Sequence, residues 1–269
     1  MFRTVCAFMA LVAFLSPVEA ETLRNVEYGS HPKQAMDVYL PDLPQNAPML
    51  VMLHGGAWKI GDKGNRRVWK AKAEYWGDKG FIVISVNTRL LPDASPVEQT
   101  QDLARAIAFI QGQAQDWGGD AGQLVLMGHS AGGHVVSLLS AREDIRRAAG
   151  LRPWKGTVGL DAGGLDVETA MQGNPPRVYQ NAFGTDPEFW AAANPSAHVN
   201  RGEGPFLIVC STRRASACRD GERFSESAGG ASILRVNMSH SAINSELGKV
   251  SSYTDAVDRW IMRALGSQY

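Results

Sequence analysis

Two residues far apart in this chain are suited to nucleophilic chemistry, the serine Ser130 and the histidine His240. Residues 128–132 read Gly-His-Ser-Ala-Gly and follow an apolar run typical of a buried strand, 124–127. Small residues permit the tight strand-to-helix turn that lifts a serine hydroxyl above a sheet. We therefore predict that Ser130 is a nucleophile. The alternative is a glycine-rich turn whose serine takes no part in chemistry.

A serine hydroxyl is a poor nucleophile until a base takes its proton, and an imidazole suits that task near neutral pH. His240 stands in the sequence Met-Ser-His-Ser, just past an apolar run at 232–236 that we expect to be a strand. A nucleophile that precedes its histidine in the chain is the order of one large group of serine hydrolases. We predict that His240 is the general base.

A second glycine-rich loop, His-Gly-Gly-Ala-Trp at 54–58, follows another short apolar run. Glycines let backbone N–H groups approach an oxygen that becomes negatively charged during acyl transfer. We expect these donors to come from Gly55 or Gly56 and from Ala57, together with the N–H of Ala131. Each donor of this kind contributes roughly 3–4 kcal/mol to a transition state.

Two side chains beside these loops are expected to contact substrate. Trp58 ends the glycine-rich loop and is expected to wall the acyl pocket, although core packing explains a tryptophan here equally well. His129 precedes the nucleophile directly and is expected to flank the bound substrate. Neither residue is assigned to proton transfer.

The elements that must hold these loops alternate along the chain. Short apolar runs alternating with helix-spaced apolar segments predict an α/β fold, with a mostly parallel sheet covered by helices on both faces. We expect strands at 23–28, 35–40, 49–53, 81–86, 124–127, 157–160, 206–209 and 232–236, and helices through 97–113, 135–140 and 253–265. Neither a linker nor a repeat divides residues 21–269, so one domain is expected. The segment 161–198 is irregular and is a candidate lid over the site.

Three runs of residues, 54–63, 128–133 and 239–248, resemble one known family in the expected order. They are similar to the α/β-hydrolases of the feruloyl-esterase-like BD-FAE group, which is close to hormone-sensitive-lipase-like and kynurenine-formamidase-like esterases. The resemblance covers nearly all of the chain beyond residue 20. It implies the α/β-hydrolase fold and hydrolysis of esters or similar acyl bonds without a cofactor. It also implies a buried structural ion pair between Arg89 and Asp102.

The acid that should orient His240 is missing from its usual place in such folds. That place lies a few residues past the expected strand 206–209, and here it carries Arg214. We rank Asp220 first as the acid, with Glu222 less favoured. Asp166, from the loop after the preceding strand, is the second choice. The remaining alternative is that no acid is present and the enzyme is weakened, since losing this function costs a serine protease about 10⁴ in turnover.

The adjacent arginines Arg213 and Arg214 are a further feature of this loop. A guanidinium group suits a carboxylate, so the pair is a candidate for binding an acidic substrate. A solvated basic loop explains the same two residues more simply.

The first twenty residues have the three parts of a secretory signal peptide. Arg3 is followed by an apolar run through Leu15, and Ala20 is a plausible cleavage point. The run of about 11 residues is short for a bilayer span, which needs about 20, although an N-terminal anchor is the alternative. Export to the periplasm or medium is therefore expected, with no stable membrane insertion after cleavage. In such a compartment Cys210 and Cys218 are expected to form a disulfide rather than two free thiols.

Composition narrows the function classes. Lys and Arg together number 27, the same as Asp and Glu, so the chain lacks the basic excess expected of a nucleic-acid-binding domain. Metal-ligand spacing and a dinucleotide fingerprint are both absent from the sequence, so we expect no metal and no cofactor. The prediction is an exported serine hydrolase that cleaves small carboxylic esters through an acyl-enzyme. An arylformamidase or amidase, or an impaired ligand-binding protein on a hydrolase scaffold, are the alternatives.

Overall fold

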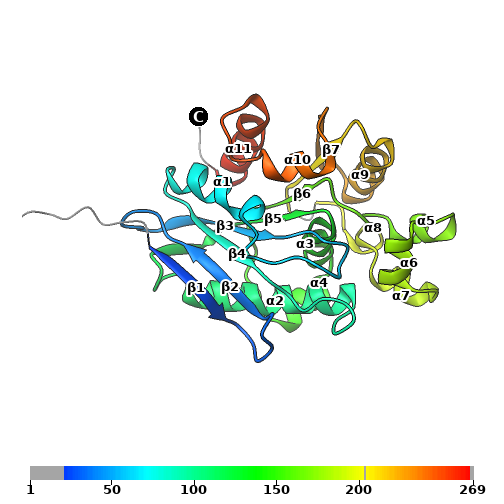
Figure 1. Ribbon diagram of the computed structural model, residues 1–269, viewed down its shortest axis with the longest axis horizontal. Coiled ribbons are helices and arrows are strands. Elements are labelled where there is room, and N and C mark those ends of the chain that lie inside the picture. The colour runs from blue at the N-terminus through cyan, green and yellow to red at the C-terminus, as the bar shows by residue number, and fades with distance from the viewer. Residues whose placement is uncertain (1–20, 203, 267–269) are drawn as a thin grey trace, which may run out of the picture.

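The computed structural model describes residues 21–202 and 204–266, and its centre is an eight-stranded sheet (Figure 1). The strand order is β1-β2-β4-β3-β5-β6-β7-β8. The strands are β1 Thr22–Glu27, β2 Ala35–Tyr39, β3 Ala47–Leu53, β4 Ile82–Val86, β5 Gly119–His129, β6 Gly156–Leu160, β7 Phe206–Ser211 and β8 Ser232–Val236. The helices are α1 Arg66–Gly77, α2 Pro96–Gln113, α3 Ala131–Ala141, α4 Glu143–Ala148, α5 Val167–Gln172, α6 Arg177–Phe183, α7 Pro187–Ala192, α8 Pro195–His198, α9 Ala215–Ala228, α10 His240–Ser245 and α11 Ser252–Ala264.

The sheet is mostly parallel, as the sequence predicts. Strand β2 pairs antiparallel with β1 and β4, and every other pairing in the sheet is parallel. Parallel strands need cover on both faces, which explains why β4, β6 and β7 are buried along their whole length. One face packs against α1, α10 and α11, and the other against α2, α3 and α9.

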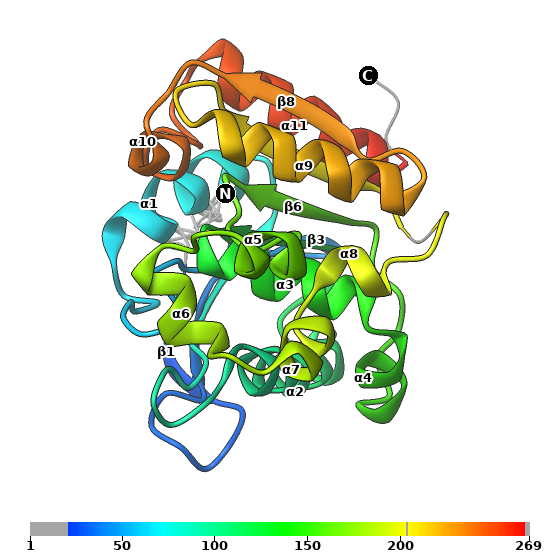
Figure 2. The same cartoon turned by 90° about the vertical axis from the view of Figure 1, so that its right-hand side faces the viewer.

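The parallel strands all end at one edge of the sheet, and the loops that carry the site follow them there. In Figure 2 the short helices α5 to α8 lie in front of the sheet. These helices fill the segment 161–198, which the sequence analysis treats as irregular. Helices α1 and α9 are not among the helices expected from the sequence, and both are rich in charged and polar residues.

The ion pair between Arg89 and Asp102 is present. The guanidinium donates from Nε and Nη2 to the two carboxylate oxygens, each at 2.8 Å, and the Asp102 side chain is fully buried. Asp102 also accepts from Gln34 and Arg105. Hydrogen bonds of this kind satisfy the buried charge, so the pair fixes the turn after β4 to helix α2.

A buried lysine ties helix α1 to helix α10, which begins at His240. The Lys72 side chain is 1% exposed, and its Nζ donates to the backbone carbonyl of Asn244 at 2.7 Å. Burial lowers the pKa of Lys72 to about 7. A cation is favoured near helix carbonyls, but its desolvation makes this contact pH-dependent.

Among the described residues, no helix combines the length and the apolar character needed to cross a bilayer. The expected signal peptide at 1–20 lies outside the described residues.

Replacing Lys72 with methionine tests the burial of this lysine. Between the folded pKa of about 7 and the ordinary value of 10.5, the unfolded chain binds more protons than the folded one. The wild-type free energy of unfolding should therefore rise, relative to Lys72→Met, by on the order of 3–4 kcal/mol between pH 7 and pH 10. Urea unfolding across this range measures the difference. Lys70→Met, on the exposed side of the same helix, is the matched control, and a flat difference for Lys72→Met would contradict the prediction.

Candidate active site

Ser130 occupies a strained turn between strand β5 and helix α3. Its backbone has φ 55° and ψ −119°, a conformation that non-glycine residues rarely adopt. A Cβ atom at Gly128 would stand 2.2 Å from the carbonyl oxygen of Gly132. At Gly132 it would stand 2.3 Å from the carbonyl oxygen of His54. The small residues of this motif are therefore required by backbone contacts on both sides of the serine.

The loop after β3 lies directly against this turn. A Cβ atom at Gly55 would be 2.9 Å from the Cβ of Ser130, and Gly56 and Ala57 both have positive φ. The backbone N–H groups of Gly55, Gly56 and Ala57 donate to no other described residue, and neither does that of Ala131 at the start of α3. Gly55 therefore lies beside the serine, and none of these four N–H groups donates to another described residue.

His240 is brought to Ser130 from the opposite end of the chain. It is the first residue of α10, and its Nε2 lies 3.0 Å from Ser130 Oγ. Ser239 caps the helix by accepting from the N–H of Ala242. Because α10 starts immediately after the loop from β8, the imidazole extends over the carboxyl edge of the sheet.

The carboxylate at His240 belongs to Asp161, a residue the sequence analysis did not consider. Asp161 Oδ2 lies 2.6 Å from His240 Nδ1, and Oδ1 accepts from the N–H of Ser211 at 3.0 Å. Asp161 directly follows β6, has φ 44°, and its side chain is fully buried. Burial raises the pKa of Asp161, but hydrogen bonds from His240 and Ser211 and the charge of Arg214 outweigh it. The pKa therefore lies below its ordinary value.

The acids predicted from the sequence lie elsewhere, so that prediction is corrected. Asp220 sits on helix α9 rather than in a loop, and it pairs with Arg223 at 2.7 Å, one turn away. Asp166 caps helix α5 and pairs with the same Arg223 at 2.8 Å. Glu222 pairs with Arg235. The alternative of no carboxylate beside His240 is excluded by Asp161.

A positional signal for Asp161 existed in the sequence. It is the first residue after a fully buried strand, and that strand pairs directly with β5, which leads to Ser130. Carboxyl ends of neighbouring parallel strands meet at one edge of a sheet. The second-ranked acid, Asp166, stands in the same segment after β6.

The predicted disulfide is present between Cys210 and Cys218. It joins the end of β7 to helix α9 and so brackets the turn that carries the two adjacent arginines. Arg213 donates from Nε and Nη2 to Asn237. Arg214 turns the other way, and its Nη1 lies 2.5 Å from Asp161 Oδ2.

His129 and Trp58, which are expected to contact substrate, are buried and contact other residues of the site. His129 Nε2 lies 2.8 Å from the carbonyl oxygen of His240, and burial and the neighbouring His240 lower the pKa of His129 to about 4. Trp58 is 2% exposed, and its ring packs edge-on against His134, Tyr179 and Phe183. The neutral His129 is thus a donor that holds the backbone of His240, and Trp58 joins the oxyanion loop to helix α6.

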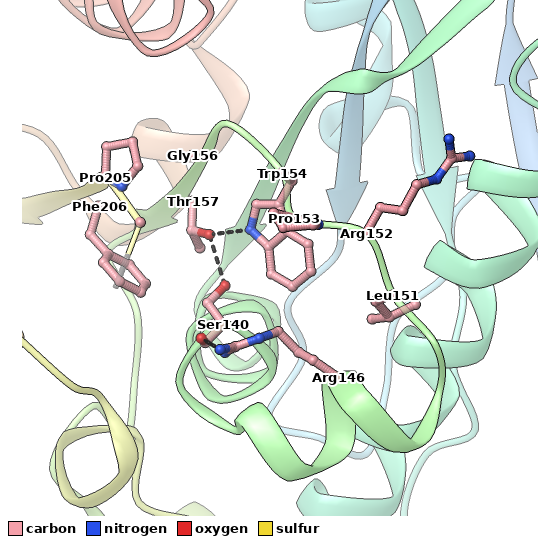
Figure 3. Close-up of a pocket in the computed structure, with 11 residues that line it drawn as sticks. Ser140, Arg146, Leu151, Arg152, Pro153, Trp154, Gly156, Thr157, Pro205 and Phe206 are labelled. Carbon is pink, nitrogen blue, oxygen red and sulfur yellow. Dashed lines mark hydrogen bonds between the residues drawn. The ribbon is translucent and has the colours of Figure 1, made fainter. Parts of the chain in front are cut away.

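One cavity among the described residues lies away from this chemistry. A cavity of about 160 Å³ opens at the amino ends of β6 and β7, the opposite edge of the sheet from Ser130 (Figure 3). Its polar groups are paired among themselves, since Trp154 donates to Thr157 and Thr157 bonds Ser140. The small cavity between Trp58 and Ala131 measures about 10 Å³, room for about one water.

A strained serine between a buried strand and a helix, on a sheet of this order, defines an α/β-hydrolase fold. A truncated form of a carbohydrate esterase from gut microbiota shares this fold, with a TM-score of 0.77 and 18% identity over 93% of this chain and 99% of that one. Esterase B from Lactobacillus rhamnosis superposes with a TM-score of 0.75 and 18% identity, over 93% of this chain and 87% of the other. The chain belongs to the BD-FAE family, whose model matches residues 36–216.

Curated relatives match parts of the chain. The probable isoprenylcysteine alpha-carbonyl methylesterase ICMEL2 of Arabidopsis thaliana is 30% identical over 52% of this chain and 32% of its own length. Esterase LipC of Mycobacterium tuberculosis is 27% identical over 71% of this chain and 50% of its own length. The chain therefore matches a third to a half of these relatives.

Gly132→Ala tests the contact between the serine turn and the oxyanion loop. The added Cβ would stand 2.3 Å from His54 O and 2.5 Å from Leu53 O, so backbone must shift. We expect a loss of about 1–3 kcal/mol in the free energy of unfolding. Gly112→Ala, at an exposed position of helix α2 where a Cβ meets nothing within 4 Å, is the control and should gain roughly 0.5–1 kcal/mol. Equal effects of the two substitutions in urea unfolding would show that the contact is absent.

Proposed function

We propose that this protein is an exported serine hydrolase that cleaves carboxylic esters through an acyl-enzyme on Ser130. The observation that carries the proposal is the continuous contact from Ser130 Oγ to His240 Nε2 and from His240 Nδ1 to Asp161 Oδ2. Membership of the BD-FAE family and the names of its relatives, which are esterases, support the same reaction class.

In the proposed reaction, the proton on His240 Nδ1 is directed at Asp161, which leaves Nε2 free to accept the hydroxyl proton of Ser130. Ser130 Oγ attacks the acyl carbon, and the developing oxyanion is held by N–H groups of the Gly55–Ala57 loop and Ala131. His240 then returns the proton to the alcohol oxygen as the C–O bond breaks. Water repeats the sequence on the acyl-enzyme and releases the acid.

The export part of the proposal rests on two features. The residues 1–20 have the composition of a secretory signal peptide, and the Cys210–Cys218 disulfide is typical of proteins in oxidising compartments. Fractionation of cells that produce the full chain, with N-terminal sequencing of the product, tests this part.

Ser130→Ala tests the nucleophile. The wild-type protein should react with a fluorophosphonate at Ser130 and hydrolyse p-nitrophenyl acetate, and the variant should do neither, because the attacking oxygen is gone. Peptide mass spectrometry locates the label, and circular dichroism controls for folding. Including N-formylkynurenine in the substrate panel separates an arylformamidase from an esterase. A folded wild-type protein that takes no label would overturn the proposal.

Asp161→Asn tests the positioning carboxylate. The amide cannot stabilise the charged imidazole, so kcat should fall by about 10⁴ while KM changes little. Asp220→Asn is the matched control, since Asp220 pairs with Arg223 and should affect kcat far less. If Asp220→Asn were the more damaging of the two, the assignment of Asp161 would be wrong.

A further inference from the structure

The guanidinium group of Arg214 lies against the pair formed by Asp161 and His240. Its Nη1 is 2.5 Å from Asp161 Oδ2 and 2.7 Å from His240 Nδ1, so one carboxylate oxygen serves both side chains. The carboxylate is fully buried, whereas the Arg214 side chain is 40% exposed. A cation thus reaches solvent beside the reacting histidine.

Arg214 keeps hydrogen-bond donors to spare. Its contacts with Asp161 and His240 use Nη1, while Nε and Nη2 bond to no other residue in the described part of the chain. The other acids of this region do not compete for them, because Asp220 and Asp166 both bond to Arg223. Nε and Nη2 lie in the plane of one guanidinium group, and two such donors can bind a carboxylate with two parallel hydrogen bonds.

The backbone below Arg214 is firmly held. The N–H of Arg214 donates to the carbonyl of Ser211, and the disulfide between Cys210 and Cys218 closes the turn on both sides. The guanidinium is therefore presented from a fixed point, and little ordering is needed when a ligand binds.

We propose that Arg214 binds an anionic group on the alcohol part of the substrate, so that the preferred substrates are esters of hydroxy acids. This inference rests on the proposed function. His240 Nε2 must return a proton to the leaving oxygen, so the alcohol part lies beside the imidazole, and Arg214 lies at the Nδ1 side of the same ring. The anion binds the unused donors Nε and Nη2, so Nη1 keeps its contact with Asp161 Oδ2 while substrate is bound.

Two acetates of matching shape test the inference. In 4-acetoxybutanoate the alcohol part ends in a carboxylate, and in 4-methylpentyl acetate an isopropyl group replaces it. The wild-type kcat/KM, measured by pH-stat, should favour the anionic acetate by about tenfold, as expected for hydrogen bonds to a charged group. Arg214→Gln should abolish this preference, and Arg214→Lys should keep part of it.

Arg213→Gln is the matched control, because it removes the same charge from the neighbouring residue, whose guanidinium is bound to Asn237. The ratio of the two kcat/KM values should stay within about twofold of the wild type. Fluorophosphonate labelling of Ser130 in each variant shows that the site is intact.

The outcomes separate this inference from the proposed function. Labelling of Ser130 with no preference for the anionic acetate, or with a preference that survives Arg214→Gln, overturns the inference alone. A folded wild-type protein that neither takes the label nor hydrolyses either acetate overturns the proposed function, and the inference with it.

Discussion

The carboxylate of Asp161 carries a charge and has no access to solvent, so protein groups must supply its hydrogen bonds. The positions of the other site residues depend on this requirement. Its partners come from three elements, the N–H of Ser211 at the end of β7, the imidazole at the start of α10 and the guanidinium before α9. Removing one partner from a buried ionic group is strongly destabilising. The ends of β7, α9 and α10 are therefore fixed relative to β6, whose neighbour β5 carries the nucleophile.

The features with short local patterns could be predicted from the sequence. The turn around Ser130 and the loop at Gly55–Ala57 need small residues within a few positions of each other, and the structure places both loops in contact. The positions of the strands along the chain follow from apolar runs of strand length, since parallel strands covered on both faces tolerate little else. His240 was found through its position after the last strand.

The acid beside His240 could not be predicted from local sequence patterns, because its position depends on which strand ends meet in space. Asp161 has no motif around it, and its only mark is that it ends a buried strand next to the nucleophile's strand. Asp220 ranks first because it is the first acid after the strand Phe206–Ser211, but it lies on helix α9. The burial of Trp58 likewise depends on Tyr179 and Phe183, which come from a segment without a clear apolar period.

The ends of β6 and β7 both reach the same nitrogen of His240, one with Asp161 and the other with Arg214. The scaffold therefore has two neighbouring positions for the acid, and occupation of the first leaves the second open to a residue of opposite charge. A sequence pattern that demands an acid after the seventh strand would classify this chain as an inactive hydrolase. Classification of related sequences by the carboxylate at either strand end would avoid that error.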